Sequence, residues 1–388
     1  MKLLVTSVVR GSSRREPSGA VTTVDLDAGV ADKTCPIPEA DFLLFDINPR
    51  GGLRGGKGIA LTDNRICFAT ASHILLYDYQ WSLRSVITHP SCASIHDMVE
   101  RDGSLWVTST ENDLVFQFDL GGRILSTFNY KDHAVTIREL GLKPSQTIPL
   151  DRDAILAGSR DYRDPRTHRI AQTNNAHLNS LCFLENGDML VSLGRLTPWK
   201  MAVLMSLKGI LTKARIYAII VAVNQALIKL LGLKRQKNSA LAFVPATAQS
   251  VILRVTPAGA CTILFRFDDT TVPNHSLCPL DNGTVLYCDT NNGNLLVLDP
   301  DSGTVCKRIF VAEDFLRGIE PLSQTLVAVG SQHTVHVVDL EREAVVQKVQ
   351  ISEDPRVAIF DIQVLPPGVA SLPDVLAEPD RSEIPEDS

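Results

Sequence analysis

The chain has 388 residues, of which 44% are hydrophobic and 21% are charged, a composition typical of a globular protein with a sizeable core. Its formal net charge of -6 argues against a nucleic-acid partner, because phosphate backbones are bound by a concentrated positive field. The eight cysteines show no CxxC spacing and lie mostly in apolar runs, which predicts reduced thiols and a cytoplasmic location.

The N-terminal apolar run extends from Leu3 to Val9, is interrupted by Thr6 and Ser7, and ends at Arg10. It is too short for the hydrophobic region of a secretion signal, so we expect a first β-strand here. No uncharged apolar stretch of the sequence is long enough to span a bilayer.

One unit of four short β-rich segments recurs along the chain. Each copy contains a tight turn, an apolar strand, a second turn and a third strand, and four of the third strands end in Asp. The copies begin at residues 57, 94, 177, 275 and 317, and their first turns include Asp63-Asn64, Asp102-Gly103, Asn186-Gly187 and Asn282-Gly283. Asx-Gly pairs between alternating segments indicate hairpins, and four strands in a period of about 40 residues are typical of β-propeller blades.

A further blade can be assembled from the two ends of the chain. Residues 357–366 (VAIFDIQVLP) have the character of an innermost strand, and the N-terminus supplies the outer strands that it lacks. Pairing the two ends would remove the last exposed sheet edges. The sequence therefore predicts an all-β protein, a six-bladed β-propeller over residues 1–366 closed by its N- and C-terminal strands.

Three segments depart from the repeat. Residues 127–175 form a polar insertion, expected to be a structured loop on the propeller face, and residues 367–388 form an acidic tail expected to be disordered. Residues 198–237, inside the fourth blade when the closing blade is counted first, have the apolar periodicity of a helix. This helical insertion could pack on the outside of the propeller, cover the central pocket as a lid, or make a peripheral membrane contact.

The repeat pattern resembles the six-bladed propellers of the senescence-marker-protein/gluconolactonase, strictosidine-synthase-like and NHL-repeat group, and more loosely the streptogramin lyases. The resemblance rests on the Asx-Gly turns, on apolar strands such as ICFA, LWVT and VLYC, and on the third strands that end in Asp. It covers roughly residues 1–366 and concerns the repeats, so it implies the fold and leaves the activity open.

Polar residues stand at equivalent starts of several blades, where innermost strands meet the central channel. The aligned positions are Lys57, His96, Ser180, Ser276 and Arg317, with Asp361 at or next to the sixth; beside them lie Asp97, His177, Asn179, Asn274 and His275. A single histidine at a blade start is usually a hydrogen-bonded structural residue. Three at equivalent starts favour a shared site, because polar groups that converge in a concave pocket mark an active site.

Two mechanisms fit this ring of residues. In the first, His96, His177 and His275 bind one divalent metal ion, assisted by Asn179 or Asp361. The resembling lactonases hold a divalent cation here with carboxylate and amide ligands, a pattern from which the three histidines depart.

In the second mechanism, one histidine is a general base. Lys57 and Arg317, with Asp97 beside them, bind an anionic substrate or stabilise an oxyanion.

The functional hypothesis is a propeller enzyme of the hydrolase or lyase type. It would act in the central pocket on a small substrate with an apolar part, which the apolar insertion at 198–237 suggests. The alternative is a non-catalytic propeller that binds a protein or a small ligand on one face. The oligomeric state is left open.

Overall fold

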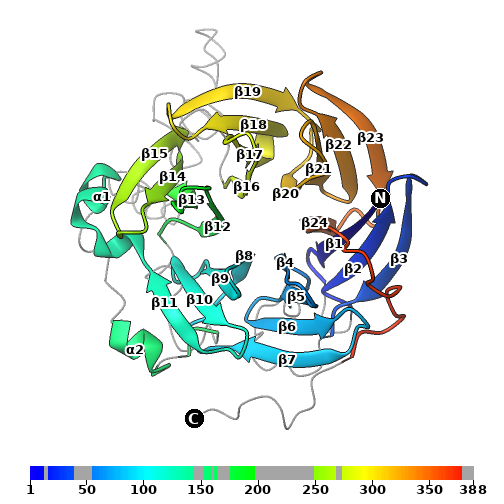
Figure 1. Cartoon of the computed structure of the whole chain (residues 1–388), viewed down its shortest axis with the longest axis horizontal. Coiled ribbons are helices and arrows are strands. Elements are labelled where there is room, and N and C mark those ends of the chain that lie inside the picture. Colours follow the sequence, from blue (N-terminus) through cyan, green and yellow to red (C-terminus); the bar gives the residue numbers. More distant parts are fainter. Residues whose placement is uncertain are drawn as a thin grey trace, which may run out of the picture.

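The computed structural model is a ring of six four-stranded antiparallel sheets arranged around a central axis (Figure 1). It describes residues 1–12, 16–38, 55–142, 152–159, 161–163, 175–196, 249–267 and 273–377. The predicted all-β, six-bladed propeller is confirmed.

In every blade the first strand is innermost and the fourth is outermost. The closing blade consists of β24 (Val357–Val364), β1 (Lys2–Val9), β2 (Gly19–Asp25) and β3 (Val30–Pro36). The second blade consists of β4 (Ile59–Leu61), β5 (Arg65–Ala69), β6 (His73–Asp78) and β7 (Leu83–Thr88), and the third of β8 (Ile95–Arg101), β9 (Ser104–Ser109), β10 (Leu114–Asp119) and β11 (Ile124–Phe128). The fourth contains β12 (Leu178–Phe183), β13 (Met189–Leu196), β14 (Gln249–Val255) and β15 (Cys261–Phe267), and the fifth β16 (His275–Pro279), β17 (Val285–Asp289), β18 (Asn294–Asp299) and β19 (Thr304–Phe310). The sixth contains β20 (Leu316–Pro321), β21 (Leu326–Ser331), β22 (Thr334–Asp339) and β23 (Ala344–Gln350).

Local sequence explains the hairpins. Asp102 and Gly103, between β8 and β9, both adopt left-handed backbone conformations with φ of 52° and 74°. Such turns match the twist of the flanking strands and favour an Asx-Gly pair. The aspartates at the ends of the third strands cap the following turns: each accepts a hydrogen bond from the N–H two residues ahead, as seen for Asp78, Asp119, Asp299 and Asp339.

The two ends of the chain meet in one sheet. β1 pairs with β24 from Leu3 opposite Val364 to Val9 opposite Val357, which places the blue and red ends of the chain in the same blade (Figure 1). This is the pairing that the sequence predicts, and it joins the innermost strand of the closing blade to β1 with one shift of register, between Thr6 and Ser7.

The tail differs from the prediction that residues 367–388 are disordered. Residues up to 377 are described, and Leu372 and Leu376 are buried with 2% and 1% exposure in the core between the closing blade and the second blade. The indole N–H of Trp81 also donates to the Ala370 carbonyl at 2.8 Å. The acidic composition of the segment led to the prediction of disorder, but these two buried apolar side chains anchor it in the core.

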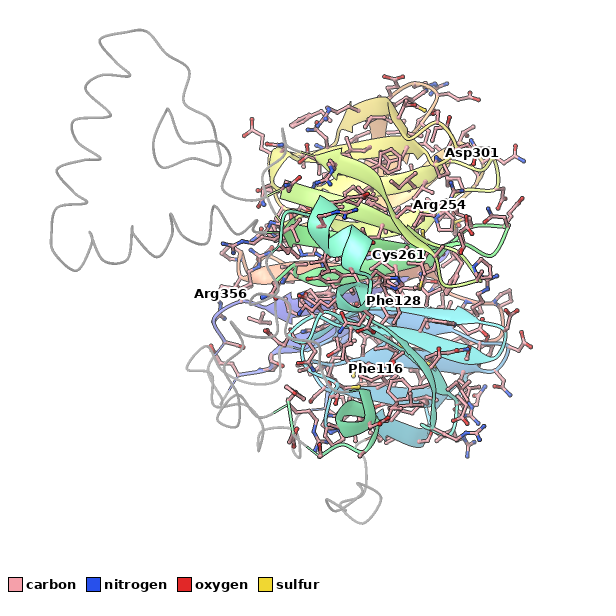
Figure 2. All side chains as sticks on the ribbon, turned by 90° about the vertical axis from the view of Figure 1, so that its left-hand side faces the viewer. Phe116, Phe128, Arg254, Cys261, Asp301 and Arg356 are labelled. Carbon is pink, nitrogen blue, oxygen red and sulfur yellow. The ribbon has the colours of Figure 1, made fainter. Side chains whose placement is uncertain are left out.

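The polar insertion carries short helices at the rim of the ring. They are η2 (Tyr130–Asp132), α1 (Ala134–Glu139) and α2 (Arg152–Leu156). The Thr136 hydroxyl of α1 donates to the Cys261 carbonyl of β15 at 3.1 Å, and Figure 2 shows α1 beside Cys261 at the outer edge. The helix α1 therefore lies against an outermost strand. The expected loop on the propeller face stays a prediction, since residues 143–151 and 164–174 lie outside the described ones.

The apolar insertion predicted to be helical, residues 198–237, lies outside the described residues, which stop at Leu196 and resume at Gln249. Among the helices that are described, none has the length and apolar character needed to cross a membrane. All eight cysteines are free thiols, as the spacing predicts.

We predict that Leu372→Ala lowers the free energy of unfolding by about 2–4 kcal/mol, because it removes a fully buried side chain and leaves a cavity. Val375→Ala is the matched control, since Val375 is 75% exposed in the same segment. Urea unfolding of the two variants measures the difference. Equal stabilities would show that the tail does not belong to the core.

Candidate functional site

The innermost strands are irregular where they face the central axis. A shift of register interrupts the pairing of β8, β12, β16, β20 and β24 with the second strand of each blade, whereas β4 pairs without one. Such β-bulges leave residues without a ladder partner and re-aim their side chains. The residues between the paired positions are His96 and Asp97, Asn179, Ser276, Arg317 and Gly318, and Phe360.

One set of side chains at these bulges joins neighbouring blades. Each accepts a hydrogen bond from a backbone N–H of the next innermost strand. The pairs are Asp361 with Ile59 (2.8 Å), Asp97 with Leu181 (3.0 Å), Ser180 with Leu277 (2.7 Å) and Ser276 with Gly318 (3.0 Å). We call these contacts the inter-blade hydrogen bonds.

Glycine occupies the corresponding position in the two remaining blades. A Cβ on Gly58 would lie 2.9 Å from the Met98 nitrogen, which is closer than packing allows. Asp97 compensates by accepting a hydrogen bond from its own neighbour Met98 at 2.9 Å, and Asp361 accepts one from Ile362 in the same way. The two aspartates thus serve two N–H groups each where the preceding blade offers no side chain.

The residues of the predicted ring therefore separate into two layers. Asp97 and Asp361 lie with Glu320 along a cavity of about 390 Å³, which we call the acidic cavity. Asp97, expected to bind substrate, and Asp361, expected to bind metal, are not in the histidine cluster. Because side chains alternate along a strand, an offset of one residue moves a side chain from one layer to the other.

Asn179, also expected to assist a metal, is directed elsewhere. Its side-chain amide donates to the Asn274 carbonyl at 2.7 Å, and the residue is 1% exposed. Ser180 and Ser276, aligned in the sequence with Lys57 and His96, belong to the inter-blade hydrogen bonds. Neither of the predicted oxygen donors, Asn179 and Asp361, is among the residues that line the cavity shared by the three histidines.

Five of the predicted residues do line one cavity of about 600 Å³, which we call the histidine cavity: Lys57, His96, His177, His275 and Arg317. Arg10 lines the edge of this cavity. The backbone N–H of Arg10 donates to the backbone carbonyl of Arg356 at 2.8 Å. Figure 2 shows Arg356 and Asp301 on opposite faces of the disc, so the histidine cavity opens on the face that carries Arg356.

The three imidazoles form a compact cluster. Their ring centroids are 4.9 Å apart for His96 and His177, 5.8 Å for His177 and His275, and 6.3 Å for His96 and His275. One ring nitrogen from each lies within 4.8 Å of the others. Residues from the third, fourth and fifth blades thus converge on a single point.

Hydrogen bonds fix the tautomers of two of the rings. His96 Nδ1 is 2.8 Å from the Ser94 carbonyl, which only accepts, so Nδ1 carries the proton. His275 Nδ1 is 3.2 Å from the Thr290 hydroxyl, which itself donates to the Cys288 carbonyl at 3.3 Å. Both rings therefore keep Nε2 as a lone-pair donor, the arrangement found where histidine binds a metal.

The third ring is held by the backbone around it. His177 has a φ of 51°, a left-handed conformation that is costly for a side chain with a Cβ. The N–H groups on either side of it, from Ala176 and Leu178, donate to the buried Asp113 carboxylate at 3.0 and 3.1 Å. Lys131 pairs with the same carboxylate at 3.4 Å. Asp113 thus holds the segment that presents His177.

Burial makes the three imidazoles neutral. It lowers the pKa of His177 to about 3, and it lowers the pKa of His96 and His275 well below the ordinary value. The nearby cations Lys57 and Arg317 lower the pKa of His96 further. Neutral imidazole is the form that binds metal, whereas a histidine with a pKa near 3 is a weak general base at neutral pH.

Several residues of the candidate site were not predicted from the sequence. Phe315 and Phe360 pack against the histidine rings, with centroids 5.4 Å from His275 and 5.6 Å from His96. Arg10 and Arg317 stack on these same phenylalanines. Arg10 and Phe360 come from opposite ends of the chain, so no local motif links them. Asp113 resembled an ordinary turn residue, and only its contacts show its role.

Comparisons with known proteins support the fold. No protein-family model and no curated protein sequence matches the chain. Similar solved structures include a Bacteroides caccae protein of unknown function (12% identity, 93% of this chain and 97% of that one, TM-score 0.51) and a nidogen/laminin complex (9%, 94% and 97%, TM-score 0.50). A virginiamycin B lyase from Staphylococcus aureus is more distant (9%, 78% and 71%, TM-score 0.43). At these identities the likeness shows the six-bladed propeller fold alone.

We predict that Asp361→Ala lowers the free energy of unfolding by about 1–3 kcal/mol, because it leaves the N–H groups of Ile59 and Ile362 without their acceptor. Chemical denaturation measures this loss. The variant should keep whatever metal the wild-type protein binds, since Asp361 is outside the histidine cluster. Loss of metal from a folded variant would return Asp361 to the ligand set.

Glu320 predicts a pH dependence of stability. Burial raises its pKa to about 7 from 4.5, so the native state binds this proton more tightly than the unfolded chain. Stability therefore falls as pH rises from about 4.5 to about 7, by at most about 3 kcal/mol from this group. Urea unfolding across that range should show a shallower fall for Glu320→Gln than for wild type. Parallel curves would contradict the assignment.

Proposed function

We propose that this propeller is an enzyme of the hydrolase or lyase type whose histidine cavity binds one divalent transition metal ion. The observation that carries the proposal is the convergence of His96, His177 and His275 from three blades, with ring nitrogens within 4.8 Å of one another. Side chains this far apart in the sequence meet only because the ring brings their strand starts together.

The donor set fits a transition metal. Three neutral imidazole nitrogens suit zinc, iron, manganese or nickel, whereas calcium prefers oxygen ligands. Zinc–nitrogen bonds of 2.0–2.1 Å in tetrahedral geometry require nitrogens about 3.3 Å apart, which small side-chain rotations reach from separations of up to 4.8 Å. Three protein ligands also leave a coordination position open, as catalytic sites require.

Each residue then has a defined task. Ser94 and Thr290 orient His96 and His275 through Nδ1, and Asp113 holds the segment that carries His177. The metal, when bound, would polarise a carbonyl group or activate water. Arg317 and Lys57 lie in the same cavity, where positive charge would either hold an anionic group of the substrate or stabilise an oxyanion that develops during hydrolysis or elimination.

The acid–base mechanism remains the second candidate. It uses the same cavity without a metal and needs one histidine to take up a proton. The low histidine pKa values favour the metal mechanism over it, since a proton acceptor works best with a pKa near the working pH.

A non-catalytic propeller would use neither mechanism. It would bind a protein or a small ligand on one face, and its histidines would have no functional reason to converge.

Metal analysis tests the proposal. We expect close to one equivalent of a transition metal in the full-length protein after zinc loading and dialysis, measured by mass spectrometry. His96→Ala, His177→Ala and His275→Ala should each weaken metal binding at least tenfold, because each removes one of three ligands. His133→Ala is the control, since His133 stacks on Phe128 at the rim.

The variants also separate the alternatives. Unchanged metal content in all three histidine variants, with the fold intact by circular dichroism, would overturn the metal proposal. If turnover of an identified substrate is lost in those variants while wild-type protein contains no metal, the acid–base mechanism replaces it.

A further inference from the structure

Arg317 is buried in the histidine cavity with an unmet hydrogen-bonding requirement. The residue is 8% exposed, and its guanidinium carbon lies 3.3 Å from the centroid of the Phe360 ring. Its Nη2 has no hydrogen-bond partner among the described residues. A buried donor without an acceptor costs about 1–3 kcal/mol, and more when it is charged. The wall of the cavity therefore contains a buried cation whose hydrogen-bonding capacity the described residues do not use in full.

Two further cations face the same space. Arg10 stacks on Phe315 with its guanidinium carbon 4.5 Å from the ring centroid, and the Lys57 ammonium is 5.6 Å from the centroid of Phe360. Lys57 is only 3% exposed. The described residues that line the histidine cavity include no aspartate or glutamate. Positive charge is thus concentrated at this end of the channel, whereas the carboxylates lie in the acidic cavity.

The two guanidinium groups also affect each other. Burial lowers the pKa of Arg317 to about 9; the charge of Asp97 acts in the opposite direction, and the charge of Arg10 lowers the pKa further. Like charges that line one buried cavity repel each other. The same repulsion would be relieved by a bound carboxylate, which gives the arrangement a physical reason.

The stacking indicates which anion fits. A guanidinium that is stacked on a phenylalanine ring has its N–H groups pointing outward in its own plane. There they can bind a planar carboxylate through two parallel hydrogen bonds. Apart from Ser94, the rest of the cavity wall is apolar and includes Val8, Pro273, Ala358 and Ile359. A cavity of about 600 Å³ is large enough for a small organic molecule.

We propose that the substrate is a small organic acid with an apolar body, whose carboxylate is bound by Arg317 together with Arg10 and Lys57. The apolar body packs against Val8, Pro273, Ala358 and Ile359, and the reacting group lies at the three histidines. This inference rests on the proposed function for the reacting group. The carboxylate subsite itself is built from residues other than the histidines.

Calorimetric titration of the full-length protein with phenylacetate tests the subsite directly. The metal-free protein, prepared with a chelator, should bind phenylacetate at least tenfold more tightly than phenylacetamide, which has the same shape without the charge. Arg317→Gln should weaken phenylacetate binding at least tenfold, and Arg317→Lys should restore only part of it, since lysine keeps the charge but not the planar fork. Arg10→Gln, at the exposed edge, should weaken binding severalfold.

Arg123→Gln is the matched control, because Arg123 is an exposed arginine that pairs with Asp119 on the third blade. It should leave phenylacetate binding unchanged. If Arg317→Gln does not fold, Arg10→Gln still decides, since its side chain is at the surface. Equal binding of phenylacetate and phenylacetamide, or tighter binding of inorganic phosphate than of phenylacetate, would overturn the carboxylate assignment.

The outcome is separable from that of the metal test. Metal binding without phenylacetate selectivity, in both metal-free and zinc-loaded protein, would overturn this inference and leave the proposed function standing. Charge-dependent phenylacetate binding without metal binding would support the subsite and remove the metal from the proposed function.

Discussion

The inter-blade hydrogen bonds are the constraint on which the rest of the structure depends. Sheets in a propeller pack face to face through apolar side chains, and such contacts alone set no register between neighbouring innermost strands. The bonds from Asp361, Asp97, Ser180 and Ser276 do set it, because each side chain must meet one N–H group of the next blade. In three of these four strands the bulge also turns the preceding residue toward the histidine cavity, namely Phe360, His96 and His275. The same bulges and hydrogen bonds therefore determine both how neighbouring blades align and which side chains face the histidine cavity.

The separation of the ring residues between the acidic cavity and the histidine cavity also explains why the two cavities differ in charge. Asp97 and Asp361 sit where strand N–H groups need acceptors, and burial together with their mutual repulsion raises the pKa of Asp361. One residue earlier in the same strands, His96 and Phe360 face the other cavity. The described lining of the histidine cavity contains no aspartate or glutamate, and Asp97 acts on Arg317 from the neighbouring layer, where its charge raises the pKa of that arginine.

The sequence predicts the blades well because their signals are local. An Asx-Gly pair such as Asp102-Gly103 determines a turn through its own backbone preference, and alternation determines which face of a strand is buried. The three histidines were also predictable, since each occurs at or just before the start of an innermost strand. The cavity that each of the ring residues faces was not predictable from the sequence. Asp97 follows His96 within one bulge, Ser180 follows Asn179 at the end of another, and a bulge leaves no mark that periodicity detects. The tail was misjudged for a related reason, because its acidic composition outweighs Leu372 and Leu376 in any average.

Through the closing blade, residues from both ends of the chain line the histidine cavity. Arg10 follows β1 and Phe360 lies in β24, so two walls of the cavity come from residues separated by almost the whole chain. During synthesis the histidines could gather before the final strand leaves the ribosome, but the cavity could not take its shape until that strand pairs with β1. A ligand that binds the finished cavity adds its binding free energy to the seam between the two ends. Occupancy of the site would then lower how often the ring opens at this seam, and with it how readily a protease reaches the two terminal strands.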